Sequence, residues 1–150
     1  MKSNNFKAIL FGIVTCSLSV PSCWALCVQA DKAFLRYGPS TKHQKTWEVY
    51  KFMPFQSLKK QKDWYRVKDV DGDIHWIFKG LVTSSYKCAV VKAEKANLRT
   101  GPGLKYKQAP WGPAQKYYAF KVIGSKDPWY HVQDAAGGKA WVHSSLIWIQ

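Results

Sequence analysis

The chain has 150 residues, with 23 Lys or Arg against 9 Asp or Glu, a formal net charge of +14 at pH 7. Aromatic residues make up 15% of the sequence, which excludes an intrinsically disordered chain, because such chains are poor in large apolar side chains. The charge predicts attraction to anionic surfaces and salt-sensitive association with them.

The N-terminus has the composition of an export signal. Lys2 and Lys7 flank the polar start of an apolar stretch over residues 8–20. This stretch is too short to cross a bilayer as a helix, since that takes about 20 residues. Small Ala25 stands where a signal peptidase would cut, so we expect residues 1–25 to be a signal peptide.

Two other interpretations of this segment remain open. The apolar stretch could be an uncleaved anchor or a buried core helix. Alternatively Cys23 could carry a lipid, because residues 20–23 loosely resemble a bacterial lipobox, although Pro21 fits that pattern poorly. With cleavage after Ala25, 21 basic and 9 acidic residues remain, a net charge of 21 − 9 = +12. The mature protein is then periplasmic or secreted, and we expect a monomer with no transmembrane span.

Cleavage leaves two of the four cysteines, Cys27 and Cys88, for which only one intramolecular pairing exists. Export places them where disulfides persist. A bridge that closes a loop of about 60 residues stabilises a fold by up to ~4 kcal/mol. We therefore predict a disulfide, with two unrelated buried thiols as the alternative.

The mature chain contains the same pattern twice. Residues 33–39 (AFLRYGP) return as residues 96–102 (ANLRTGP) at a shift of 63, and four later segments return in the same order at a shift of 65. The later pairs are 51–55 with 116–120, 63–67 with 128–132, 76–77 with 141–142, and 81–82 with 146–147. Chance does not easily supply five ordered matches, so we predict two units, residues 26–84 and 85–150.

Each unit has the pattern of short strands separated by turns. Tyr65 and Val67 point to one side of a strand and Trp64 to the other, as strand alternation requires. Residues 71–72 (DG) and 137–138 (GG) stand between two such runs and predict hairpins, because this turn needs positive φ. The fold class is therefore all-β, with two small partly open barrels after the signal peptide.

The ordered series resembles the bacterial SH3 domain family. It consists of Ala-x-Leu-Arg-x-Gly-Pro, a hydrophobic strand, Trp-Tyr-x-Val, an Asp-Gly or Gly-Gly turn, and Trp-Ile or Trp-Val followed by Leu. Both units carry it, so the resemblance covers essentially the whole mature chain as a tandem. It implies a five-stranded SH3-like barrel for each half and a binding role. Members of the family commonly attach proteins to the cell wall or act as adaptors beside cell-wall hydrolases.

The Arg and Gly of the first motif have structural interpretations. Gly at 38 and 101, each followed by Pro, permits a tight bend at the start of a loop. Arg36 and Arg99 either bond to backbone carbonyls and brace the barrel or face a ligand. We favour bracing, because small folds need polar ties where the core is thin.

Five aromatic residues are candidates for a ligand-binding groove. Alternation puts Trp64 and Trp129 on a polar strand face, so we expect both to be at least half exposed, as is typical of a binding surface. The resemblance implies that they line the peptide groove, with Tyr37, Trp47 and Trp111 as neighbours on the preceding loop. Packing of the two tryptophans between the barrels is the alternative.

The loops beside this groove are basic rather than acidic. They carry Lys42, His43, Lys45, Lys105 and Lys107. Acidic side chains that select basic, proline-rich peptides in signalling SH3 domains are not evident here. We therefore expect an anionic ligand.

These observations favour a non-catalytic binding module that recognises peptidoglycan or another anionic cell-wall polymer. The alternative is an adaptor that docks on an envelope enzyme or secretion component. We expect no catalytic residue, since a disulfide leaves no thiolate for a cysteine peptidase. We also expect no cofactor and no metal, since His43, His75, His131 and His143 lack metal-ligand spacing. Lysines among aromatics would suit nucleic acid as well, but export argues against it in vivo.

Overall fold

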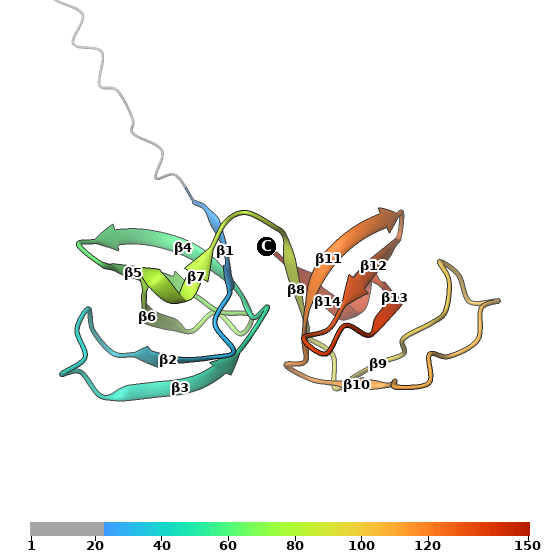
Figure 1. Ribbon diagram of the computed structural model, residues 1–150, viewed down its shortest axis with the longest axis horizontal. Helices are drawn as coiled ribbons and strands as arrows, with labels where there is room; N and C mark the ends of the chain where they lie inside the picture. The colour runs from blue at the N-terminus through green and yellow to red at the C-terminus, as the bar shows by residue number, and fades with distance from the viewer. Residues whose placement is uncertain (1–22) are drawn as a thin grey trace, which may run out of the picture.

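The computed structural model describes residues 23–150; residues 1–22, which hold most of the expected signal peptide, lie outside it. Figure 1 shows two β-sheet units side by side along the longest axis. The part described contains no α-helix, only the short 3-10 turns Lys79–Leu81 (η1) and Ser144–Leu146 (η2). Within it, no helix is long and apolar enough to cross a membrane. The all-β prediction is confirmed.

The first unit is a seven-stranded antiparallel sheet in the order β3-β2-β6-β5-β4-β1-β7. Its strands are β1 Ala25–Val28, β2 Lys32–Arg36, β3 Lys45–Tyr50, β4 Pro54–Gln61, β5 Trp64–Lys68, β6 Ile74–Phe78 and β7 Val82–Thr83. Strand β1 begins at the last residue of the expected signal peptide, where Ala25 pairs with Gln56. Before it, the carbonyl of Trp24 accepts a hydrogen bond from the backbone N–H of Ser57 at 2.8 Å.

The second unit has a five-stranded sheet in the order β13-β12-β11-β8-β14 and a separate β10-β9 pair. Its strands are β8 Cys88–Val91, β9 Lys95–Ala96, β10 Ala114–Gln115, β11 Ala119–Lys126, β12 Trp129–Gln133, β13 Lys139–His143 and β14 Ile147–Ile149. Isolated bridges join Arg99 to Gln108 and to Trp141. The bridge to Trp141 corresponds to the pairing of Arg36 with Trp76 in the first unit. In each unit, therefore, the arginine pairs with the second strand of that unit's own hairpin.

Each unit encloses its own apolar core. Val67 and Val132 are fully buried on equivalent strands, as alternation predicts, and Phe55 and Phe120 fill equivalent central places. The first core also contains Leu26, Val28, Leu35, Val49 and Ile77, and the second contains Leu98, Val91, Val142 and Ile147. Burial of large apolar side chains supplies most of the stabilisation of such small units, about 1.5–3 kcal/mol for each.

Both predicted hairpins are present, between β5 and β6 and between β12 and β13. Gly72 and Gly137 have φ of 91° and 93°, which favours glycine at both turns.

A feature that sequence reasoning missed is the buried carboxylate beneath each turn. Asp69 and Asp134 each accept the backbone N–H of the residue four positions later, at 2.8 Å and 2.7 Å. These bonds satisfy polar groups that burial would otherwise leave unpaired.

The two units are joined covalently. Cys27 of β1 and Cys88 of β8 form the predicted disulfide, and both residues are fully buried. The rings of Phe52 and Tyr86 meet edge to face beside it, with centroids 5.8 Å apart. Val90 of β8 belongs to the core of the first unit, so the junction is packed as well as bridged.

A second tie comes from Tyr117 of the second unit. Its hydroxyl donates to Asp71 Oδ2 at 2.6 Å, and its ring lies edge-on to Trp47, with centroids 5.3 Å apart. The hydrogen bond to Asp71 raises the pKa of Tyr117 above its ordinary value.

Phe52 occupies the position in the first unit that is equivalent to Tyr117. Both residues have positive φ, 71° for Phe52 and 69° for Tyr117. Such a backbone is uncommon for a bulky residue, and at both positions it directs an aromatic ring into the junction.

We predict that the double variant Cys27→Ala/Cys88→Ala loses stability, because the bridge joins residues 61 apart and restricts the unfolded chain. The free energy of unfolding in urea should fall by at most ~4 kcal/mol. Wild-type protein in reductant is the control and should show the same fall. An unchanged urea midpoint in both samples would contradict the prediction.

Candidate functional site

Each unit has one pocket beside the loop that follows its Arg, with volumes of about 440 Å³ and 400 Å³. The first is lined by Phe34, Arg36, Ser40, Thr41, Trp64, Phe78 and Leu81. The second is lined by Asn97, Arg99, Leu104, Trp129, His143, Ser145 and Leu146. Arg, Trp and Leu recur at the same repeat positions, so the two pockets are equivalent places in the two units. We call them the first pocket and the second pocket.

The tryptophans of these pockets are far more buried than the sequence predicted. Trp64 is 9% exposed and Trp129 is 8% exposed, so the expectation that each is at least half exposed is wrong. Each indole lies edge to face against the side chain paired with it across the hairpin. The ring centroids of Trp64 and Phe78 are 5.7 Å apart, and those of Trp129 and His143 are 5.2 Å apart. Each indole still contributes to its pocket wall.

The other three predicted groove residues lie outside these two pockets. Tyr37 is 69% exposed on the first loop. Trp47 lines a different cavity, of about 300 Å³, together with Tyr117 from the other unit. Trp111 packs at the edge of the second core, 6.2 Å from the ring of Phe120. The structure therefore does not bring the five aromatic residues together into one groove.

The two arginines brace their loops, as the sequence analysis favoured. Arg36 Nη1 donates to the carbonyl oxygens of Thr41 at 3.1 Å and His43 at 2.7 Å. Arg99 Nη1 donates to the two equivalent carbonyls of the second loop at 3.2 Å and 2.9 Å. The same guanidinium groups line the pockets, so one side chain holds the loop and forms a wall.

The Gly of each Gly-Pro pair has a different role from the predicted one. Its backbone does not have positive φ; instead an aromatic ring lies directly over it. A Cβ atom on Gly38 would lie 2.5 Å from Nε2 of His43, and one on Gly101 would collide with the ring of Tyr106. Glycine is therefore required because a ring packs on the loop.

We predict that Gly101→Ala destabilises the second unit by about 1–3 kcal/mol, because the ring and the loop must move. Gly103→Ala is the matched control, since its Cβ would lie 3.5 Å from the ring of Tyr106, an ordinary contact. Chemical denaturation of the two variants gives the comparison. Equal stabilities would contradict the assigned role of Gly101.

Most of the positive charge has no internal partner. Four lysines of residues 23–150 lie within 4.0 Å of a carboxylate: Lys32, Lys51, Lys79 and Lys116. This range holds 21 Lys and Arg, so 21 − 4 = 17 basic side chains have no carboxylate partner. Beside the first pocket, Lys45 Nζ lies 3.5 Å from the ring centroid of Phe34, a cation–π contact. An anionic partner would therefore meet many available cations.

A polar chain of three residues lies in the cavity that contains Trp47. His75 Nδ1 is 2.8 Å from Thr46 Oγ1, and its Nε2 is 3.1 Å from Asp69 Oδ2. Ala140 stands at the position of His75 in the second unit, so this chain is not repeated. It joins β3 to the β5–β6 hairpin. Over residues 23–150, no three or more His, Cys, Asp and Glu are arranged to hold a metal ion.

The family described as bacterial SH3 domain matches the chain twice, over residues 29–83 and 92–148, which together exceed half of its length. The chain belongs to this family. No curated protein matches the chain.

Three solved structures resemble this tandem of bacterial SH3 domains. NlpC2 from Trichomonas vaginalis is 10% identical, with a TM-score of 0.38 over 87% of this chain and 49% of that one. NlpC1 from the same organism is 10% identical, with a TM-score of 0.37 over 92% and 50%. An NlpC/P60 family protein from Bacillus cereus ATCC 10987 is 13% identical, with a TM-score of 0.38 over 84% and 56%. The chain thus spans about half the length of these structures.

Several pocket residues of the two SH3 domains were not recognised in the sequence. Thr41 and Leu104, and likewise Phe78 and His143, occupy equivalent positions in the repeat but differ in side chain. The repeat itself was the available signal, because these positions lie next to the Gly-Pro and Trp-Ile segments that define it. The differences between the two copies at these positions bear directly on ligand chemistry.

Proposed function

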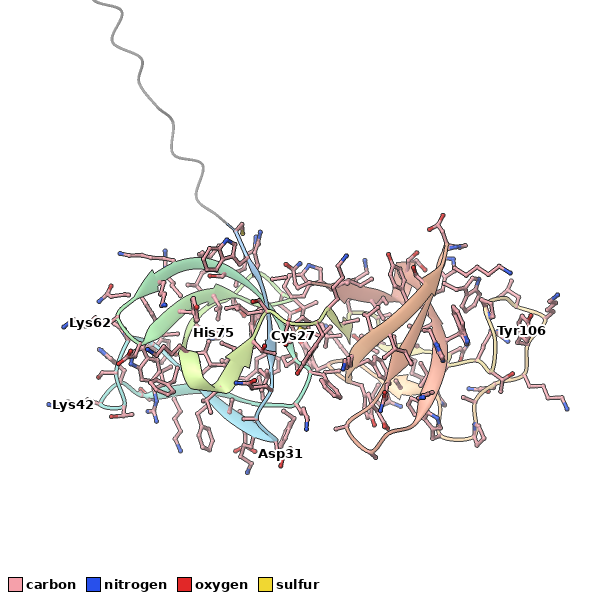
Figure 2. All side chains as sticks on the ribbon, turned by 45° about the horizontal axis from the view of Figure 1, so that its top comes forward. Cys27, Asp31, Lys42, Lys62, His75 and Tyr106 are labelled. Atoms are coloured by element: carbon pink, nitrogen blue, oxygen red, sulfur yellow. A yellow bond between two sulfur atoms is a disulfide. The ribbon has the colours of Figure 1, made fainter. Side chains whose placement is uncertain are left out.

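We propose that this tandem is a non-catalytic binding module of the bacterial envelope, which holds peptidoglycan or another anionic cell-wall polymer in its two pockets. The main support is that the Arg–Trp–Leu pocket occurs once in each SH3 domain. In Figure 2, Lys42 and Tyr106, on the two pocket loops, lie near opposite ends of the molecule. A polymer with repeating units can occupy both sites, so that the second binding event becomes intramolecular and raises avidity.

Charge supports an anionic ligand. The 17 basic side chains without a carboxylate partner can approach carboxylates or phosphates without first breaking an ion pair. The pocket loops contribute exposed lysines, among them Lys42 and Lys105. Such attraction between exposed charges increases the association rate and weakens in salt.

The disulfide supports a location outside the cytoplasm, periplasmic or secreted, because disulfides persist there. It also ties up Cys27 and Cys88, which therefore offer no thiolate for covalent catalysis. Cys23 is exposed and free, and its Sγ lies 3.2 Å from the carbonyl oxygen of Ser57. A lipid at Cys23 remains the alternative means of attachment to the envelope.

A second candidate function is an adaptor that docks on an envelope protein. One observation favours it: tyrosines remain exposed along the junction, Tyr50 at 56% and Tyr118 at 42%. Both line a cavity of about 260 Å³ with Met53 and Ala119, which combines residues of the two domains. Aromatic surface of this kind is enriched in protein interfaces.

To test polymer binding, we predict that Thr41→Glu/Leu104→Glu lowers retention on insoluble peptidoglycan at least about tenfold, because it puts a carboxylate into each pocket. Both side chains are exposed, so the fold should tolerate the change. The matched control, Ser84→Glu/Ala136→Glu, makes the same charge change at exposed positions outside both pockets. Equal retention of the two variants, or wild-type protein left in the supernatant at low salt, would refute the proposal.

Salt separates the two candidate functions. Wild-type retention on peptidoglycan should fall steeply between about 0.05 M and 0.5 M NaCl, because the Debye length shortens. A complex held by the junction tyrosines should survive this change, since burial of apolar surface is little affected. Co-sedimentation across the salt series gives the result, and salt-independent retention would contradict electrostatic attraction to the polymer.

A further inference from the structure

The two pockets share three wall residues but differ in the others. Phe34 and Phe78 of the first pocket are replaced by Asn97 and His143 in the second. Ser145 joins the second pocket at a position where the first domain has glycine. The first pocket therefore has three aromatic rings in its wall, whereas the second adds the polar side chains of Asn97, His143 and Ser145 to its tryptophan and two leucines.

The imidazole of His143 is oriented by its neighbours. Its Nδ1 accepts the backbone N–H of Ser145 at 3.2 Å and lies 2.7 Å from the hydroxyl of the same residue. A nitrogen that accepts a hydrogen bond carries no proton, so the neutral ring has its hydrogen on Nε2. Nε2 takes part in no hydrogen bond within residues 23–150, and the ring lines the second pocket beside Trp129. His143 therefore supplies an unused donor.

The guanidinium of Arg99 also has unused donors. Only Nη1 is committed to the loop carbonyls. The Nε–H has no acceptor either, but it is buried; Nη2, which takes part in no hydrogen bond among the described residues, is the donor that a ligand can reach. Within residues 23–150 no carboxylate forms an ion pair with Arg99, and no acidic side chain lines the second pocket. A positive group with free donors favours a carboxylate, which accepts charge-assisted hydrogen bonds.

We propose that the second pocket is a receptor for the carboxylate of a peptide, which lies between Arg99 and His143 with its apolar part against Trp129. The first pocket has Arg36 but presents Phe78 where His143 stands, so it takes an uncharged, apolar part of the ligand. The assignment rests on the proposed function and deepens it, because the two domains then recognise different chemical groups of one polymer.

Surface plasmon resonance tests the carboxylate preference of the full-length mature protein. One surface carries a short Ala-Ala peptide attached by its N-terminus, with a free carboxylate, and the other carries the same peptide as a carboxamide. Wild-type protein should bind the carboxylate about tenfold more tightly, as expected for hydrogen bonds to a charged group. A third surface carries glucuronic acid, and equal binding there would assign the carboxylate to a sugar rather than a peptide, overturning the peptide assignment.

The variant His143→Phe puts into the second pocket the residue that the first pocket has at this position, and it should abolish the preference for carboxylate over carboxamide. It leaves the formal net charge unchanged, so non-specific attraction to the carboxylate surface stays the same. His143→Gln keeps a donor at this position and should retain a preference. The matched control is His131→Phe, which makes the same substitution at a ring stacked on Trp141, outside both pockets.

Equal wild-type binding to carboxylate and carboxamide, no binding to either surface, or a preference that survives in His143→Phe would each overturn the inference. Sedimentation with peptidoglycan distinguishes this failure from that of the proposed function. Retention on the polymer with no carboxylate preference refutes only the assignment of the second pocket. A carboxylate preference without retention refutes only the polymer.

Discussion

Each pocket depends on one guanidinium that holds a loop without regular structure. The loop segments 37–44 and 100–107 project from small sheets and have few apolar side chains to bury, and Leu104 among them is exposed. Arg36 and Arg99 replace that missing burial with two hydrogen bonds each to loop carbonyls. A ring packed on glycine fixes the rest of each loop. Bonds from a charged donor are stronger than neutral ones, so a single side chain can position the outer wall of the pocket.

The junction gives the two pockets a defined relation. The disulfide alone would allow rotation, but Tyr117 adds a hydrogen bond to Asp71 and a ring contact with Trp47. Val90 buries apolar surface of the second unit in the core of the first. Because these ties lie between the units and the pocket loops lie at the far ends, the arrangement suits a long ligand better than a small one (Figure 2).

The repeat carried most of the fold prediction. It defined the two units, while strand alternation and the turn residues within each copy predicted the all-β class and the two hairpins. The pairing of Cys27 with Cys88 followed from counting the cysteines left after cleavage. The burial of Trp64 was missed for a definite reason. Alternation says which face of a strand a side chain occupies, but it does not say that neighbouring side chains, such as Phe78 on the paired strand, pack against it there.

The position of Trp47 could not be predicted for a related reason. Trp47 meets a tyrosine from the other unit, and no pattern within one unit reveals how two units dock. The buried Asp69 and Asp134 were also missed, because an acidic residue beside a turn ordinarily faces solvent. A comparison of the two copies position by position would have revealed the Phe78/His143 difference, since both lie at the end of the same hairpin.

The most direct test of the account is an amide and indole NMR titration of the mature protein with solubilised peptidoglycan fragments. Signals from the indole N–H groups of Trp64 and Trp129 should shift together with those of the loops around Thr41 and Leu104. The indole of Trp148, which lines neither pocket, should stay in place. Saturable binding with no shift at either pocket would contradict the central claim that these two pockets hold the polymer.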